Sequence, residues 1–203
     1  AELARFHIIR GTAYRSSSLN LKAAQEFQNA IAKVKDGPQK ANAHFQLGEL
    51  YFDEKSFDLA LSNYKKALQI FSDLNDHEQK AKAQYKAGIV FKKLEDYPSA
   101  IGLFEAVLNS EDSDLMRQAL CHDELAHIYF EQANFEQAIE HFEISNDQYR
   151  NFNFNSSLVE NLRSMALIYR TSKDHGNAIK CLSEASEICQ KNGDLRTAVI
   201  CLS

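Results

Sequence analysis

Side chains that could bind a metal come closest together at Cys121, His122 and His127. Imidazole and thiolate are ligands that Zn²⁺ prefers, and two histidines four residues apart on a helix can hold the ion. His122 and His127 are five residues apart, which places them on different sides of a helix. The sequence therefore predicts no metal site and no cofactor, and we expect His122 to pack between helices.

Groups able to perform nucleophilic or acid–base catalysis show no recognisable arrangement. The sequence contains no GxSxG, P-loop or GxGxxG motif. The adjacent carboxylates Glu95–Asp96 and Glu111–Asp112 fall in turn signals, where acidic side chains usually cap helices or face water. Cys181 and Cys189 lie among apolar residues of a predicted helix, as buried structural thiols do. These observations favour a protein that is not an enzyme.

A pattern of small, aromatic and bulky apolar residues returns five times, about every 38 to 40 residues. Each copy places a small residue and an aromatic residue in a first helix, then an alanine and a bulky residue in a second helix. The copies are Gly11, Tyr14, Ala23 and Phe27; Gly48, Tyr51, Ala60 and Tyr64; Gly88, Phe91, Ala100 and Phe104; Ala126, Tyr129, Ala138 and Phe142; and Ala166, Tyr169, Ala178 and Leu182. Because positions three and four apart share a helix face, the pattern predicts helix pairs that approach closely at the small residues.

The pattern resembles the tetratricopeptide repeat (TPR), in the long variety found in kinesin light chains, Pins-like adaptors and Rap-type regulators. The resemblance implies an all-α fold, a right-handed α-solenoid of about five antiparallel helix pairs (a TPR-like superhelix) plus the start of a further helix. Tryptophan, which is usual in this family, does not occur. Its position holds His7, His44, Gln84, His122 and Leu162.

The repeats predict one solenoid domain over residues 1–203. The repeats are expected at about 4–37, 41–76, 81–114, 119–154 and 159–194, with a partial helix at 195–203. First helices are predicted at about 3–15, 40–53, 79–93, 114–132 and 156–172, and second helices at about 20–34, 57–74, 97–109, 135–150 and 175–191. Ile200 and Leu202 do not provide the polar cap that ends a solenoid. We therefore expect a fragment of a longer protein that could self-associate through this uncapped end.

Composition restricts the partners and the compartment. The net charge of −5 and the pI near 5.8 argue against nucleic acid as a partner. No apolar run approaches the roughly 20 residues of a membrane span. The cysteines Cys121, Cys181, Cys189 and Cys201 lack CxxC spacing. Unpaired cysteines in helices fit a reducing compartment, so a cytoplasmic location is expected. The alternative is an extracytoplasmic location without disulfides.

The resemblance implies that one face of the first helices lines a concave groove for partners. Several side chains there are large and apolar, with charged side chains at the edges. The positions are Asn42, Phe45, Glu49, Phe52, Lys82, Tyr85, Lys86, Ile89, Asp123, His127, Phe130, Arg163, Leu167 and Arg170. Apolar surface edged by charge is typical of interaction sites, so we expect a protein or peptide segment with apolar and acidic groups. The alternative for any one of these side chains is packing against the next repeat.

Two functions follow from these expectations. The first is a non-enzymatic scaffold that holds a peptide or a partner helix in the concave groove. The alternative is the sensor portion of a signalling or transcriptional regulator that responds to a short peptide. An enzyme is the least favoured class, because no active-site spacing is evident.

Overall fold

The computed structural model describes residues 2–110, 114–194 and 197–198, and within them it contains helices and turns but no strand. The helices are α1 (Glu2–Ser16), α2 (Asn20–Ala32), α3 (Pro38–Asp53), α4 (Phe57–Asp73), α5 (His77–Lys93), α6 (Tyr97–Leu108), α7 (Leu115–Glu131), α8 (Phe135–Phe152), α9 (Asn155–Thr171) and α10 (His175–Lys191). Every predicted helix is present, and its ends lie within two residues of those expected. The all-α fold is confirmed.

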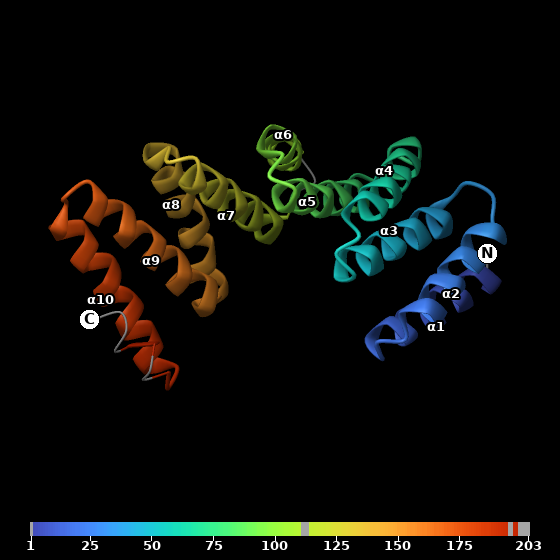
Figure 1. Ribbon diagram of the computed structural model, residues 1–203, viewed down its shortest axis with the longest axis horizontal. Coiled ribbons are helices and arrows are strands. Elements are labelled where there is room, and N and C mark those ends of the chain that lie inside the picture. The colour runs from blue at the N-terminus through green and yellow to red at the C-terminus, as the bar shows by residue number, and fades with distance from the viewer. Residues whose placement is uncertain (1, 111–113, 195–196, 199–203) are drawn as a thin grey trace. The chain divides into compact units, whose positions relative to one another are not determined.

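The helices form two compact units, residues 1–113 and residues 114–203. In the first unit, α1 pairs with α2, α3 with α4 and α5 with α6, while α2 also packs on α3 and α4 on α5 (Figure 1). In the second unit, α7 pairs with α8 and α9 with α10, and α8 packs on α9. Each unit is thus a stack of helix pairs, as expected for a TPR-like solenoid. A single array over 1–203 stays a prediction, and most of the partial helix at 195–203 lies outside the described residues.

Close contacts at the small residues hold each pair together. A Cβ atom added to Gly48 would lie 2.7 Å from the ring of Tyr64, and one added to Gly88 would lie 2.7 Å from the ring of Phe104. Gly11 has the same relation to Phe27, at 2.6 Å. These glycines therefore let two helices approach until a ring rests on the backbone. The predicted packing role is confirmed.

The turn inside each repeat has three residues, of which the middle one adopts a left-handed conformation. These residues are Ser18, Lys55, Glu95, Ala133 and Lys173, with φ between 58° and 61°. The residue after each of them bonds back to the carbonyl of the repeated aromatic residue, as Ser56 N does to Tyr51 O at 2.8 Å. This pattern satisfies carbonyl groups at the helix end, which offsets the strain of a left-handed residue that is not glycine.

Asp96 closes the same kind of turn and then begins the next helix. Its Oδ1 accepts a hydrogen bond from Ser99 N at 3.2 Å, which is the N-cap contact of α6. Glu95 is the left-handed residue of that turn. The interpretation of Glu95–Asp96 as a turn and cap is confirmed, whereas Glu111–Asp112 lie outside the described residues.

The α5–α6 pair offers a matched test of the close contact. We expect Gly88→Ala to lower the free energy of unfolding by about 1–2 kcal/mol, because overpacking against Phe104 exceeds the gain in helix propensity. Gly102→Ala, in α6, has open space around its Cβ and should raise the same quantity by about 0.5–1 kcal/mol. Urea unfolding of both variants measures the difference. Equal effects of the two substitutions would contradict the packing role of Gly88.

Candidate functional site

On the first unit, Glu49 links the first helices of three successive repeats. Its carboxylate lies 3.5 Å from Arg15 Nη2 of α1 and 3.3 Å from Lys86 Nζ of α5. Tyr64 Oη donates a hydrogen bond to Glu49 Oε1 at 2.6 Å. Burial, and then the charge of Glu49, raise the pKa of the Tyr64 phenol, so the hydroxyl remains a donor. Arg15 also reaches Asp53 Oδ2 at 2.8 Å, which extends the set of ion pairs.

Phe45 is not part of the exposed apolar surface that we expected in the groove. It is only 4% exposed, because its ring packs against Tyr64 with the centroids 5.6 Å apart. The ammonium group of Lys82 covers the same ring at 5.0 Å from its centroid. The half-buried Phe52 packs on Phe57 in the same way, at 5.9 Å. Apolar side chains on this face therefore serve mainly to join helices.

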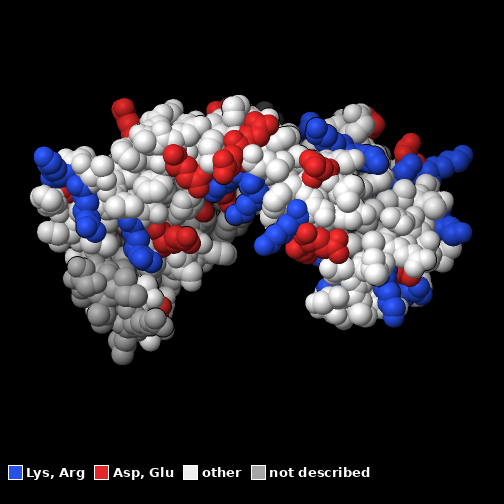
Figure 2. Space-filling model, viewed as in Figure 1, with Lys and Arg blue, Asp and Glu red and all other residues white. Residues whose placement is uncertain are grey.

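The other expected positions of the first unit differ in exposure. Tyr85 is half-buried against Phe104, with the ring centroids 5.9 Å apart, and Ile89 is also half-buried. Asn42 and Lys82 are exposed. Positive and negative side chains are interspersed over the visible face of this unit (Figure 2). Among these side chains, Arg10, Arg15, Lys40 and Lys86 form ion pairs within the unit.

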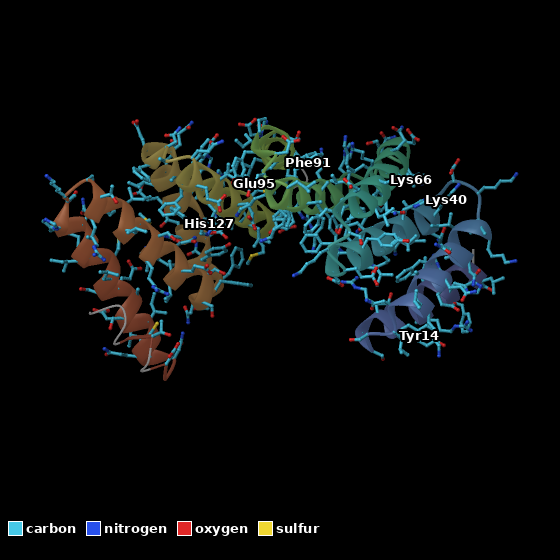
Figure 3. All side chains as sticks on the ribbon, viewed as in Figure 1. Tyr14, Lys40, Lys66, Phe91, Glu95 and His127 are labelled. Carbon is cyan, nitrogen blue, oxygen red and sulfur yellow. The ribbon has the colours of Figure 1, made fainter. Side chains whose placement is uncertain are left out.

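On the second unit, Asp123 and His127 approach each other along α7. His127 Nε2 lies 3.8 Å from Asp123 Oδ1, and the imidazole edge meets the ring of Phe142 at a centroid distance of 5.1 Å (Figure 3). Burial raises the pKa of the Asp123 carboxyl, and the charge of His127 opposes that rise. Burial and the charge of Asp123 raise the pKa of Tyr149. These groups form a partly buried polar cluster, and the half-buried Phe130 packs on Phe135 at 6.2 Å nearby on α7.

Arg163, Leu167 and Arg170 form the most open part of the expected groove. They share one face of α9, because they are four and three residues apart. All three are exposed, and Leu167 exposes 49% of its surface. Within the residues that the structure describes, neither arginine forms an ion pair. We call these three residues the α9 stripe.

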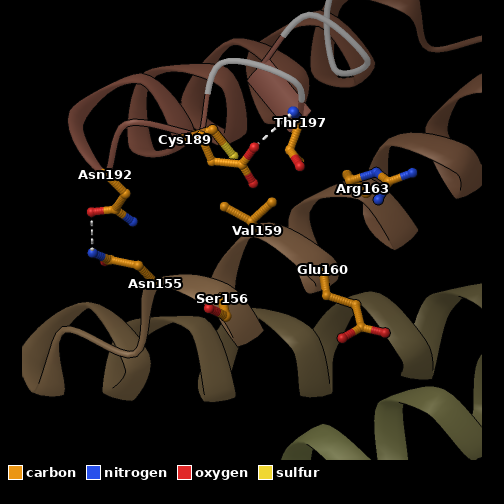
Figure 4. Close-up of a pocket in the computed structure, with 9 residues that line it drawn as sticks. Asn155, Ser156, Val159, Glu160, Arg163, Cys189, Asn192 and Thr197 are labelled. Carbon is orange, nitrogen blue, oxygen red and sulfur yellow. Dashed lines mark hydrogen bonds between the residues drawn. The ribbon is translucent and has the colours of Figure 1, made fainter.

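Arg163 also lines a cavity of about 340 Å³ between α9 and α10 (Figure 4). At its far side Asn155 Nδ2 donates a hydrogen bond to Asn192 Oδ1 at 3.2 Å. Glu160 also lines the cavity, so both positive and negative side chains face it. Asn155 and Asn192 lie just outside the predicted helices 156–172 and 175–191. Their contact depends on how the two helices pack, so no local sequence pattern predicts it.

Three of the five residues at the tryptophan position, all of them histidines, form polar contacts across the helix pairs. The contacts are His7 Nδ1 with Glu26 Oε2 at 2.8 Å, His44 Nδ1 with Asn63 Oδ1 at 3.0 Å, and His122 Nδ1 with His141 Nδ1 at 2.8 Å. Each partner is 19 residues further along the chain, and this constant separation is a signal that the sequence analysis missed. The packing role expected for His122 is confirmed.

Across the described parts of the chain, no three His, Cys, Asp or Glu side chains are grouped to hold a metal ion. Cys121, Cys181 and Cys189 are buried, as expected for the last two, and burial raises the pKa of Cys121 to about 12. Cys201 lies outside the described residues. In the same described parts, no helix is both long enough and apolar enough to cross a bilayer.

Burial and the neighbouring His141 lower the pKa of His122 from its usual value near 6.5 to about 4. Between these two values the unfolded chain binds a proton that the folded chain does not, so stability falls as the pH falls. We expect His122→Gln, which copies Gln84 of the third repeat, to weaken this dependence. Thermal unfolding at pH 7.5, 5.5 and 4.5 measures it.

The exposed His175, changed to glutamine, is the matched control for His122→Gln and should leave the pH dependence as it is in the unchanged chain. If His122→Gln and the unchanged chain lost stability in parallel between pH 6.5 and 4, the assigned role of His122 would be wrong.

The chain matches the family model for the tetratricopeptide repeat over residues 39–110 and 115–191. A comparison with curated proteins finds no match. Among solved structures, the apo form of RapI has a TM-score of 0.84 at 16% identity, covering 98% of this chain and 56% of that chain. BtubC (BKLC) from P. vanneervenii has a TM-score of 0.80 at 17% identity, covering 90% and 78%.

A Rap protein complexed with Competence and Sporulation Factor has a TM-score of 0.70 at 15% identity, covering 98% of this chain and 62% of that chain. At such identities the likeness establishes the fold alone. The chain spans little more than half of the RapI chain. The family model matches most of the chain, and its repeated small residues make the contacts that the helix pairs require. The chain therefore belongs to the tetratricopeptide repeat family.

Proposed function

We propose that this protein is a non-enzymatic scaffold that binds a peptide segment or a partner helix on the first-helix faces of its repeats. The family and the stacked helix pairs support a role in protein–protein interaction. The observation that carries the proposal is the α9 stripe, in which two arginines that have no acidic partner among the described residues flank an exposed leucine.

The α9 stripe favours a partner with both apolar and acidic groups. Burial of a leucine side chain contributes roughly 1.5–3 kcal/mol, and Leu167 is only about half covered. Guanidinium groups bind carboxylates through paired hydrogen bonds and lose less hydration than an ammonium group. A segment that places an apolar side chain between two carboxylates would therefore satisfy Arg163, Leu167 and Arg170 together.

The first unit contributes differently to this function. Lys86 is already paired with Glu49, and Lys82 lies over Phe45, so a charge reversal at either lysine would disturb packing as well as binding. Asn42 and Lys82 remain exposed and can contact a partner at the edge of this face. Substitutions in the α9 stripe therefore give a clearer test of binding.

Panning a phage-displayed peptide library against the purified chain tests the proposal. We expect enrichment of peptides with an apolar residue flanked by Asp or Glu. The double variant Arg163→Glu/Arg170→Glu should weaken binding of these peptides at least tenfold, because each charge pair at a partly buried contact contributes about 1 kcal/mol and reversal adds repulsion.

The double variant Lys180→Glu/Lys191→Glu, on exposed positions of α10, makes the same change in net charge and should bind the peptides as the unchanged chain does. Fluorescence anisotropy with the enriched peptides compares the three proteins. No enrichment, or equal losses in both double variants, would overturn the proposed role of the α9 stripe.

A second candidate is the sensor portion of a peptide-responsive regulator. The fold likeness to RapI and to the Rap protein complexed with Competence and Sporulation Factor favours this candidate. A sensor changes shape when it binds its ligand, because only a difference in affinity between two conformations shifts their populations. We expect small-angle scattering to show a smaller radius of gyration with an enriched peptide bound. An unchanged radius of gyration at a saturating peptide concentration would contradict the sensor and favour the scaffold.

A further inference from the structure

The helix α8 carries a row of carboxylates along one side. Glu136, Glu140, Glu143 and Asp147 follow one another at spacings of four, three and four residues, and all four are exposed. Among the described residues, only Asp147 of this set forms an ion pair, with Arg150 Nη1 at 2.8 Å. Like charges one turn apart destabilise a helix, so the set costs α8 stability when no cation lies beside it. We call these four residues the α8 row.

The packing of the repeats does not require the α8 row. The repeats align on the alanine of the second helix, which is Ala138 in α8. The same four positions hold Leu21, Gln25, Gln28 and Ala32 in the first repeat; Asp58, Ser62, Lys65 and Gln69 in the second; Pro98, Gly102, Glu105 and Asn109 in the third; and Gly176, Lys180, Ser183 and Glu187 in the fifth. No other repeat has more than one carboxylate there. The row is therefore a feature of α8 alone.

The α8 row borders a cavity of about 370 Å³ to which α8, α9 and α10 all contribute. The apolar part of its lining is Leu162, Met165, Tyr169 and Cys181, which are buried or half-buried. Glu143 lines the cavity as well. Burial, and then the charge of Glu143, raise the pKa of the Tyr169 phenol, so the carboxylate and the ring lie near each other. The cavity thus combines apolar walls with a carboxylate.

The fifth repeat lacks the polar contact that other repeats make across their helix pair. Leu162 and Cys181 stand at the positions at which His44 bonds to Asn63 in the second repeat, and both are buried. The wall of the cavity is therefore apolar at a place where that repeat is polar. Such a wall suits the methylene groups of a long side chain, which lose contact with water when they are buried.

Asn146 supplies an unused hydrogen-bond acceptor at the same cavity. Asn146 lines the cavity although it is only 1% exposed, and its Nδ2 donates to Met165 Sδ at 3.4 Å. Its Oδ1 is buried and has no hydrogen-bond partner. A buried acceptor without a donor is costly, and the second and third repeats avoid the cost with Leu68 and Leu108 at this position. A ligand that brings an N–H group would satisfy Asn146.

The charged side chains that line the cavity leave one carboxylate unbalanced. Arg150 lies 2.9 Å from Glu184 and 2.8 Å from Asp147, so one guanidinium already serves two carboxylates. Lys180 brings the second cation, and Glu143 brings the third carboxylate. The cavity can therefore accept one further positive charge, despite the two cations that it already has.

A guanidinium group fits these features better than a metal ion or an ammonium group. Within the residues that the structure describes, no three His, Cys, Asp or Glu side chains converge on a point that could hold a metal ion. A guanidinium is flat, donates several hydrogen bonds, stacks on aromatic rings and loses its hydration more readily than an ammonium group. It can donate to Glu143 and to Asn146 while its plane rests against Tyr169.

We propose that the α8 row and the cavity beside it bind an arginine-rich segment of another protein, with one arginine side chain in the cavity and further basic side chains along Glu136 and Glu140. The charge of this partner is opposite to that of the partner proposed for the α9 stripe. The α8 row also belongs to a second helix, whereas the α9 stripe belongs to a first helix. The two surfaces can therefore be tested separately.

Three synthetic peptides, in which alanine alternates with arginine, lysine or citrulline, test the proposal. In an extended peptide alternate side chains lie about 6.6 Å apart on one side, close to the spacing of about 4.5–6 Å along the α8 row. Fluorescence anisotropy with the full chain should show that the arginine peptide binds at least tenfold tighter than the uncharged citrulline peptide and at least threefold tighter than the lysine peptide. Equal affinities of the arginine and citrulline peptides would overturn the proposal.

Agmatine, which carries a guanidinium group without a peptide, separates a small molecule from a protein segment as the occupant. It should bind at least tenfold more weakly than the arginine peptide, because it cannot reach the rest of the α8 row. Binding of agmatine as tight as that of the peptide would assign the cavity to a small molecule and overturn the proposed segment.

Variants of the chain locate the site. Glu140→Gln/Glu143→Gln should weaken binding of the arginine peptide at least tenfold, whereas Glu160→Gln/Glu187→Gln, on exposed positions of α9 and α10, makes the same change in net charge and should leave binding unchanged. Asn146→Leu should remove the preference for arginine over lysine, and circular dichroism checks that each variant stays folded. Equal losses in the two double variants, or a dimer of the chain that Glu140→Gln/Glu143→Gln dissociates in analytical ultracentrifugation, would overturn the proposal.

Discussion

The contact of a large ring with a residue that has little or no side chain determines most of this structure. Where Tyr64 rests on Gly48 and Phe104 on Gly88, the two helices of a repeat are held at close distance and in a fixed register. That register brings residues 19 apart into contact, so His44 meets Asn63 and His122 meets His141. The polar contacts are therefore a consequence of apolar packing, and they add specificity to it.

Much of the fold could be predicted from the sequence because its signals are local. The helix ends follow from turn and capping residues, and Asp96 shows such a signal in its bond to Ser99 N. The buried side of each helix follows from spacings of three and four residues. The candidate site was harder to predict. Phe45 stands within the expected groove side, yet its ring packs on Tyr64, and the spacing of residues alone does not show which of two neighbouring surfaces a side chain contacts.

Ion pairs between repeats could not be predicted from local sequence patterns either. Arg15 and Asp53 are 38 residues apart, and their ion pair depends on how two repeats stack and how far the long side chain reaches. Such pairs occur in both units, since Arg150 Nε lies 2.9 Å from Glu184 Oε1 in the second. On the first unit, Arg15 and Lys86 both pair with Glu49 and so connect three first helices. On the second unit, Arg163 and Arg170 of the α9 stripe are exposed, and we propose that they bind a partner. Under that proposal the same helix face joins repeats in the first unit and recognises a partner in the second.

The burial of the cysteines gives this protein an internal reporter of local opening. Cys121 is fully buried and its raised pKa keeps little thiolate available, so a thiol reagent reaches it only when its helices separate, whereas Cys189 lines the cavity beside Arg163. Modification of Cys121 must wait until a repeat separates from its neighbour. Cys121 belongs to the α7–α8 pair, so the rate at which it is labelled would report how often that pair separates from its neighbours.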